Sequence, residues 1–256
     1  RGTPQFQAVA HRSLGLEGRK AAIIGCPPPR LLEVIQGIEQ EFGLPSPTLG
    51  GQWAKTSHEV RKSWMITGLD GSGRQQAYAP QRVFSVAKEL GVEYVVISLG
   101  WWNKSLGSYP INTNSFPNGA DSLKAVADAA HAQGLKLGLH VMTSSISKDD
   151  PYVRPRPDPR LCHEGEATLA ADVDAAAETI PTRESVADFG TATGYWAGRG
   201  MDILIDDEII RYGGIAEDSR ALIRCVRGAY GTRAAQHTAG AKVRHITERY
   251  GWYVAN

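Results

Sequence analysis

The chain has 256 residues, of which 42% are hydrophobic and 21% are charged, which is enough for one barrel or for two smaller domains. A formal net charge of +1 gives no reason to expect a nucleic acid or a membrane surface as partner, and no apolar run approaches the roughly 20 residues that span a bilayer. Three cysteines, Cys26, Cys162 and Cys225, are too far apart for a CxxC zinc site or a disulfide framework, so we expect neither a metal nor a cofactor.

Residues 1–60 predict an α/β segment that ends in a connector. A short apolar run at 19–26 is typical of a buried strand. Residues 31–42 carry apolar side chains on one helical face and are closed by Gly43, which predicts a helix. The prolines and glycines of 45–51 then predict a loop.

Residues 61–164 predict strands that alternate with helices. Strands are expected at 62–69, 94–99 and 135–141, and helices at 80–90 and 121–133. The run 94–99 is largely apolar, as in a strand buried on both faces. Gly134 directly follows the helix expected at 121–133 and can cap its C-terminus. Alternation of this kind indicates a parallel sheet.

Two adjacent tryptophans follow the strand at 94–99 and are the strongest site signal in the sequence. Trp101 and Trp102 can bind the apolar faces of sugars through their indoles, although one could belong to the core while the other caps the sheet. Asn103 and Lys104 could bond sugar hydroxyls, although a solvated loop also fits Lys104. In a parallel α/β fold the loops at the carboxyl ends of strands carry the chemistry.

Two further candidates end neighbouring strands. His140 lies at the end of the strand at 135–141, where a neutral imidazole can orient a hydroxyl or serve a structural role. Asp70 ends the strand at 62–69, and Asp70-Gly71 is also an ordinary turn pair. Substrate contacts are therefore expected from these two residues and from the 101–104 run, while the catalytic residues stay unassigned.

The character of the chain changes near residue 149. The proline-rich run 150–159 cannot be helical, since proline removes backbone donors and fixes φ. Residues 165–246 show short apolar runs separated by turn residues, which predicts a small all-β module. We expect residues 247–256 to form a return segment. The expected division is therefore 1–60, 61–164, 165–246 and 247–256.

Three consecutive carboxylates interrupt this module. Asp206 and Glu208 would share one face of a strand, with Asp207 on the other, and two carboxyls about 5 Å apart could cleave a glycoside with retention. A hairpin turn is the alternative, because the apolar run after Glu208 continues as a second strand. The sequence favours the turn.

The passage that ends the α/β segment resembles a known family. Its residues are Phe116-Pro117-Asn118-Gly119, then Leu123, then Ala130-His131-Ala132-Gln133-Gly134-Leu135-Lys136-Leu137-Gly138. They resemble the passage joining the second and third strands of melibiase-type glycoside hydrolases, the α-galactosidase-like barrels. The resemblance implies a (β/α) TIM-type barrel and a carbohydrate substrate.

Two departures from the family pattern limit what the resemblance implies. The family usually carries acidic residues just after the second strand, where this chain has Ser98, Gly100, Trp101 and Trp102. Its nucleophile and acid/base aspartates lie on the fourth and sixth strands, which have no counterpart here. The run from Asp207 to Tyr212 and the run from Cys225 to Ala241 resemble instead a β module of phage-tail and secreted bacterial proteins, which implies no chemistry.

The expected fold is α/β, a partial (β/α) TIM-type barrel with an inserted or appended all-β module. A whole barrel needs eight βα units and about 250 residues, and only three or four units fit before Asp149. The rest of the same polypeptide or a second chain would then complete the barrel. The expected function is part of a glycoside hydrolase whose carboxylates lie outside this chain, in an extracellular or periplasmic compartment. The alternative is a non-catalytic carbohydrate-binding or structural adhesion protein.

Overall fold

A computed structural model describes Gly18 and residues 24–66, 68–72, 74, 75, 78–194 and 200–255. The strand expected at 19–26 lies mostly outside the described residues, and 24–26 have no regular structure. Residues 1–62 and residues 63–256 form two compact units. In the described part of the chain, no helix is long and apolar enough to cross a membrane.

The described residues of the first unit include an amphipathic helix and a short hairpin. A 3-10 turn (Pro28–Arg30) leads into α1 (Leu31–Glu41), where the sequence predicts a helix. The hairpin pairs β1 (Thr48–Leu49) with β2 (Gln52–Trp53), and a 3-10 turn (Ala54–Thr56) leads into α2 (His58–Arg61). Glu39 on α1 accepts a hydrogen bond of 2.8 Å from the Trp53 indole, which ties the helix to the hairpin.

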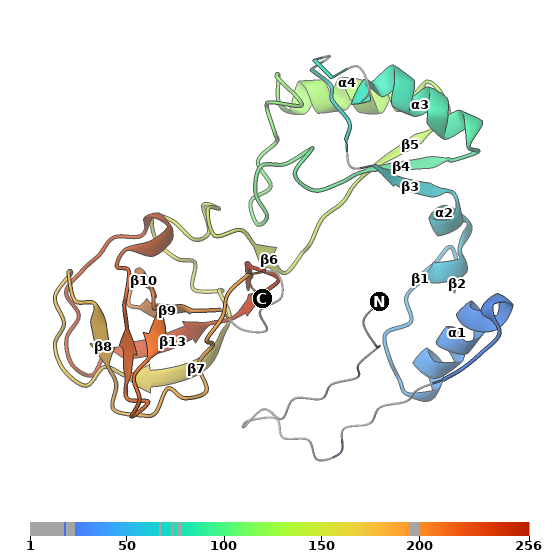
Figure 1. The fold of residues 1–256 in the computed structure, drawn as a ribbon. Helices are drawn as coiled ribbons and strands as arrows, with labels where there is room; N and C mark the ends of the chain where they lie inside the picture. Colours follow the sequence, from blue (N-terminus) through green and yellow to red (C-terminus); the bar gives the residue numbers. More distant parts are fainter. Residues whose placement is uncertain are drawn as a thin grey trace, which may run out of the picture. The chain divides into compact units, whose positions relative to one another are not determined.

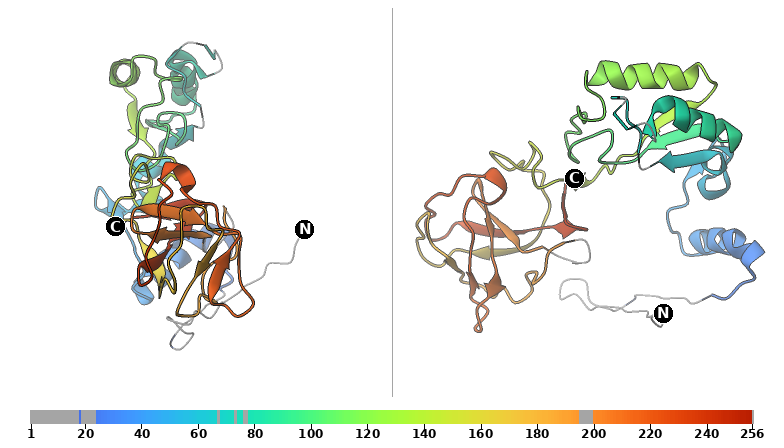
Figure 2. Two further views of the ribbon diagram at one scale, coloured as in Figure 1. Left: turned by 90° about the vertical axis from the view of Figure 1, so that its left-hand side faces the viewer. Right: turned by 45° about the horizontal axis from the view of Figure 1, so that its top comes forward.

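The second unit begins with a parallel α/β segment, as the alternating pattern predicts. Its sheet has the order β3 (Ser63–Ile66), β4 (Tyr94–Ile97), β5 (Lys136–Leu139), and both pairs are parallel. α3 (Pro80–Glu89) and α4 (Ala120–His131) cover one face of this sheet (Figures 1 and 2). Proline at the first position of α3 suits a helix start, because its missing N–H has no helical partner there.

The two faces of this sheet differ in how well they are covered. On the helix side, Ile66, Val95 and Ile97 pack with Phe84 and Val126 in one buried core. On the opposite face Met65 is 55% exposed, and Val96 and Gly138 are half-buried. The three strands do not close into a barrel within the described residues, and the observed architecture is a mixture of helices and sheets.

The chain from residue 145 onward forms short strands, mostly antiparallel. Among the described residues it contains no α-helix, only a 3-10 turn (Ala229–Gly231). Four strands pair in the order β10-β9-β13-β7, three in the order β11-β12-β8 and three in the order β14-β15-β6. Their bounds are β6 (Ser145–Ile146), β7 (His163–Thr168), β8 (Thr179–Pro181), β9 (Asp202–Ile205), β10 (Glu208–Arg211), β11 (Gly214–Ile215), β12 (Ala221–Ile223), β13 (Lys242–Ile246), β14 (Glu248–Arg249) and β15 (Trp252–Val254). We call residues 145–255 the β-rich part.

The first and last strands of the β-rich part are neighbours. β15 pairs with β6 through Tyr253 and Ile146, and the Ala255 N–H donates to the Ser144 carbonyl at 3.0 Å. β15, which carries Trp252 and Tyr253 near the end of the sequence, is therefore a strand between β14 and β6. Tyr253 is fully buried in the small core beneath it.

The Asp206–Asp207 pair forms the turn between β9 and β10. Glu208 pairs with Ile205 across the two strands, so only Asp206 and Asp207 lie between them. The hairpin favoured from the sequence is confirmed. Asp206 adopts a φ of 51°, a left-handed conformation that Asp tolerates better than most residues.

Candidate functional site

The candidate site residues follow the carboxyl ends of β3, β4 and β5. Because the three strands are parallel, these ends lie along one edge of the sheet. The loop of residues 100–112, which follows β4, carries both tryptophans, and we call it the tryptophan loop. It is held together by a bridge between Asn103 and Ile111 and by a hydrogen bond of 2.9 Å from the Asn112 N–H to the Trp102 carbonyl.

Trp102 is part of the packing of the tryptophan loop. Its side chain is 6% exposed and stacks on Tyr109, with ring centroids 5.4 Å apart and planes 3° from parallel. Its indole N–H donates to the His140 carbonyl at 3.0 Å, and the Tyr109 hydroxyl donates to the Met142 carbonyl at 2.8 Å. The pair thereby ties the tryptophan loop to the chain that leaves β5.

Trp101 is more accessible than its neighbour. It is half-buried and lies against Tyr78, with centroids 5.1 Å apart and rings tilted by 52°. Tyr78 comes from the loop after β3 and is 39% exposed, so two strand ends contribute one aromatic group each. Nothing in the sequence distinguishes Tyr78 from other loop tyrosines, because its role depends on contact with Trp101.

Asn103 and Lys104 have different environments. Asn103 is 2% exposed, and its side chain accepts from the Gly100 N–H at 3.0 Å and donates to the Ser105 carbonyl at 2.8 Å. Both ends of this amide are therefore used inside the tryptophan loop. Lys104 is exposed, and its backbone N–H donates to the Pro110 carbonyl at 2.8 Å.

Asp70 organises the loop after β3. It is 3% exposed and accepts from the N–H groups of Ser72 at 2.9 Å and Gln75 at 2.8 Å, and from the Ser72 hydroxyl at 2.5 Å. Burial alone would raise its pKa, but these hydrogen bonds outweigh burial and hold the pKa of Asp70 below its usual value. The carboxylate stabilises a turn, the role that the Asp70-Gly71 pair also allowed.

His140 directly follows β5 and has one ring nitrogen uncommitted. The residue is half-buried, and its Nδ1 is buried without a hydrogen-bond partner among the described residues. Its backbone N–H donates to the Ile97 carbonyl at 2.9 Å and its carbonyl receives the Trp102 indole. Since an unpaired buried nitrogen costs free energy, this position favours a hydroxyl donor from outside the described residues.

A buried carboxylate anchors the tryptophan loop from the β-rich part. Asp150 is 0% exposed, and its Oδ2 accepts from the Ser105 hydroxyl at 2.6 Å, the Ser108 hydroxyl at 2.8 Å and the Ser108 N–H at 3.1 Å. Ser147 adds a second contact, because its Oγ accepts from the Leu106 N–H at 2.8 Å. Sequence reasoning did not identify these residues, since their partners lie about 40 positions away.

Glu208 cannot serve as a free catalytic carboxylate. It is 1% exposed and accepts from Arg227 Nε at 2.9 Å and Nη2 at 2.8 Å, and from the N–H groups of Gly228 at 2.8 Å and Ala235 at 2.9 Å. His237 bridges it to Asp206, with both nitrogen–oxygen distances 2.8 Å. Burial opposes the charge, but the Arg227 pair and the other donors hold the pKa of Glu208 below its usual value.

A second buried charge cluster surrounds Lys148. Its Nζ lies 2.6 Å from both Asp202 Oδ2 and Glu248 Oε2, and 4.9 Å from the ring centroids of Tyr230 and Tyr253. Although burial disfavours the cation, the two carboxylates raise the pKa of Lys148 above its ordinary value. All of these groups are paired with one another, so the cluster joins the start of the β-rich part to β9 and β14.

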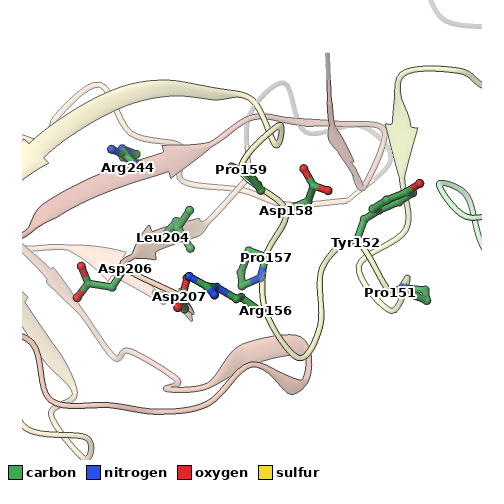
Figure 3. Close-up of a pocket in the computed structure, with 10 residues that line it drawn as sticks. All are labelled: Pro151, Tyr152, Arg156, Pro157, Asp158, Pro159, Leu204, Asp206, Asp207 and Arg244. Atoms are coloured by element: carbon green, nitrogen blue, oxygen red, sulfur yellow. The ribbon is translucent and has the colours of Figure 1, made fainter.

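A hollow beside the β9–β10 turn is lined by charged side chains (Figure 3). Arg156 pairs with Asp207 at 2.9 Å, while Asp158 pairs with Arg160, Asp206 with His237 and Arg244 with Glu166. Each charged side chain that lines the hollow thus already has a partner within the chain, so the hollow offers few free charges to a ligand. The described residues contain no group of His, Cys, Asp and Glu arranged to hold a metal.

Comparison with known proteins places the similarity in the α/β segment and in the first strands of the β-rich part. The family model described as Melibiase matches residues 60–178. The alpha-galactosidase Mel36A of Lactobacillus acidophilus is 38% identical over 78 residues, 28% of this chain and 10% of that protein. The alpha-galactosidase AgaA of Geobacillus stearothermophilus is 36% identical over 105 residues, 38% of this chain and 13% of that protein.

A third relative, the alpha-galactosidase A of Cellvibrio japonicus, is 33% identical over 113 residues, 43% of this chain and 25% of that protein. The alignments therefore span between 10% and 25% of the length of these relatives. The family match covers β3, β4, β5 and the tryptophan loop, where the sequence pattern also resembles the family. The family match and these relatives support the assignment of residues 60–178 as a segment of melibiase type.

Proposed function

We propose that the chain is part of a glycoside hydrolase that cleaves α-galactosides. The observation that carries the proposal is the coincidence of the family match with a parallel βα segment whose strand ends carry aromatic side chains. Three relatives named as alpha-galactosidases, each 33% to 38% identical over the aligned residues, support a galactoside as substrate. A flat indole such as Trp101 suits the apolar face of galactose.

We propose that residues 61–164 supply the first βα units of a TIM-type barrel. The sheet has helices on one face only, and Met65 on the other face is 55% exposed. In a barrel that second face points inward and is covered by the remaining strands. The rest of the same polypeptide, or a second chain, would then pair with the free edges of β3 and β5.

We propose that residues 165–246 are a β module inserted after the third barrel strand, with 247–256 as its return segment. The pairing of β6 with β15 supports this arrangement, because it brings the chain that leaves the α/β segment beside the chain that returns. A module whose two ends are neighbours can be inserted into a loop without displacing the flanking strands.

Within the site, we propose that Trp101, Lys104 and His140 contact the sugar. Trp101 is half-buried, Lys104 is exposed, and the His140 Nδ1 has no partner among the described residues. Trp102, Asn103 and Asp70 would hold the loops in place, since their polar groups are used by neighbouring backbone. The residues assigned to the sugar are thus those that are partly exposed or have a polar group without a partner among the described residues.

The chemistry is proposed to need two carboxylates that this chain does not supply. Retaining hydrolysis requires one carboxyl as nucleophile and one as acid and base, about 5 Å apart. Asp206 and Glu208 are both engaged by His237, and Glu208 is buried against Arg227. They therefore support the fold of the β-rich part and not the cleavage of a glycoside.

The test is binding and hydrolysis measured on the same samples. We expect the 256-residue chain to bind methyl α-D-galactopyranoside in calorimetry and to leave aryl α-galactosides intact, whereas the full product of its gene hydrolyses them. Turnover by the chain alone that is lost in both Asp206→Asn and Glu208→Gln would make it a self-sufficient enzyme. A full gene product that binds galactosides without hydrolysing them would favour the non-catalytic binding protein instead.

A further inference from the structure

The tryptophan loop donates its strongest hydrogen bonds to a carboxylate outside the α/β segment. Asp150 Oδ2 accepts three hydrogen bonds from Ser105 and Ser108, between 2.6 and 3.1 Å. Its Oδ1 accepts from the Tyr152 N–H at 3.1 Å, so both oxygens of this fully buried carboxylate are used. Bonds to an ionised acceptor are about twice as strong as neutral ones.

The backbone of the tryptophan loop is shaped to receive this carboxylate. Gly107 has a φ of +115°, a conformation that L side chains rarely adopt. A Cβ added at Gly107 would lie 2.8 Å from Asp150 Oδ1, closer than real Cβ contacts allow. Glycine at this position is therefore required both by the backbone conformation and by the close approach of Asp150.

The segment that carries Asp150 is itself fixed to the rest of the β-rich part. Ser147 exchanges two hydrogen bonds with Leu106, donating its N–H at 3.0 Å and accepting the Leu106 N–H at 2.8 Å. Lys148, next in sequence, forms its ion pairs with Asp202 and Glu248 inside the β-rich part. Neighbouring residues of one short segment thus hold the tryptophan loop on one side and the β-rich core on the other.

We propose that Asp150 is a positioning residue, through which the β-rich part fixes the tryptophan loop and with it Trp101 and Trp102. Asp150 acts on the tryptophans through Ser105 and Ser108, the loop residues that donate to it. The contact of Trp101 with sugar rests on the proposed function, whereas the ordering of the loop does not. The β-rich part therefore controls saccharide affinity without contacting saccharide.

The test compares Asp150→Asn with Asp149→Asn in the 256-residue chain. Asp149 is the exposed neighbour and provides a matched change of charge. In Asp150→Asn the acceptor is neutral, so the three bonds from Ser105 and Ser108 lose their charge assistance, and the amide cannot accept on both sides as the carboxylate does. The backbone amides of Lys104 and Asn112, which bond only within the loop, should then exchange with solvent at least about tenfold faster.

Two further readouts separate positioning from a purely structural contact. The Trp102 indole N–H, bonded to the His140 carbonyl, should shift and broaden in NMR spectra of Asp150→Asn, while the amides of β4 and β5 keep their exchange rates. Affinity for methyl α-D-galactopyranoside should fall at least about fivefold in Asp150→Asn and stay unchanged in Asp149→Asn.

Exchange at Lys104 and Asn112 that is the same in both variants would overturn the proposal, and so would acceleration confined to Ser108. If Asp150→Asn does not fold, the double variant Ser105→Ala/Ser108→Ala removes the two hydroxyl bonds from the loop side, keeps the Ser108 N–H bond, and must accelerate exchange at the same two backbone amides. If the loop loosens as expected in Asp150→Asn but the unsubstituted chain binds no galactoside, only the proposed function is contradicted.

Discussion

Replacement of Glu208 by glutamine should destabilise the β-rich part strongly. The substitution keeps the shape of the side chain but removes a charge that is 1% exposed and opposite Arg227, itself 6% exposed at the side chain. Removing one partner of a buried ion pair costs about 3–5 kcal/mol, because the other charge is left uncompensated. The five hydrogen bonds that converge on the two carboxylate oxygens support this magnitude.

The assay is urea denaturation at neutral pH, with the amide protection of β9, β10 and β13 as a regional readout. Glu166→Gln is the matched control, because Glu166 also pairs with a lysine and an arginine but its side chain is 41% exposed. An exposed pair of this kind contributes at most about 1 kcal/mol. A loss below about 1 kcal/mol in Glu208→Gln, or equal losses in the two variants, would refute the reasoning.

Two other predictions follow from burial and from the shifted carboxylates. Trp102→Ala should cost about 3–5 kcal/mol of stability, because removal of the 6% exposed indole would leave a cavity. Trp101→Ala should mainly weaken the binding of methyl α-D-galactopyranoside measured by calorimetry, and unchanged affinity would remove Trp101 from the site. Burial opposes the charges of Glu248 and Asp150, but hydrogen bonds from Lys148 and from Ser105 outweigh it and lower both pKa values in the folded chain. Their stabilisation is therefore complete above the ordinary glutamate pKa of 4.5 and is lost as the pH falls below it, so the melting temperature should drop with acid, and a constant value down to about pH 3 would contradict this.

The sheet and its helices were predictable because their signals are local. The helix expected at 80–90 is α3 (Pro80–Glu89), and the strands expected at 94–99 and 135–141 pair in parallel as β4 and β5. Proline, glycine and apolar spacing set these boundaries within a few residues along the chain. The hairpin at Asp206 was also predictable, since the apolar run resumes immediately after the turn.

The arrangement of the site was not predictable, because it depends on distant partners. Trp101 and Trp102 are identical in type and adjacent, yet Tyr109 and the His140 carbonyl bury only the second. Asp149 and Asp150 are likewise adjacent, but one is exposed and the other is 0% exposed. No local pattern separates the members of either pair, and only contacts formed in the folded chain do so.

The pairing of β6 with β15 also bears on how a longer polypeptide could fold. The Ser144 carbonyl and the Ala255 N–H are 3.0 Å apart, although about 110 residues separate them along the chain. Closing a flexible loop of that length costs roughly 3 kcal/mol more than closing a tight turn, since the entropic term grows with the logarithm of loop length. If the β-rich part is inserted between two strands, as proposed above, those strands would meet at nearly the entropic cost of a short connection once β6 and β15 have paired, so folding of the β-rich part first would favour closure of the sheet.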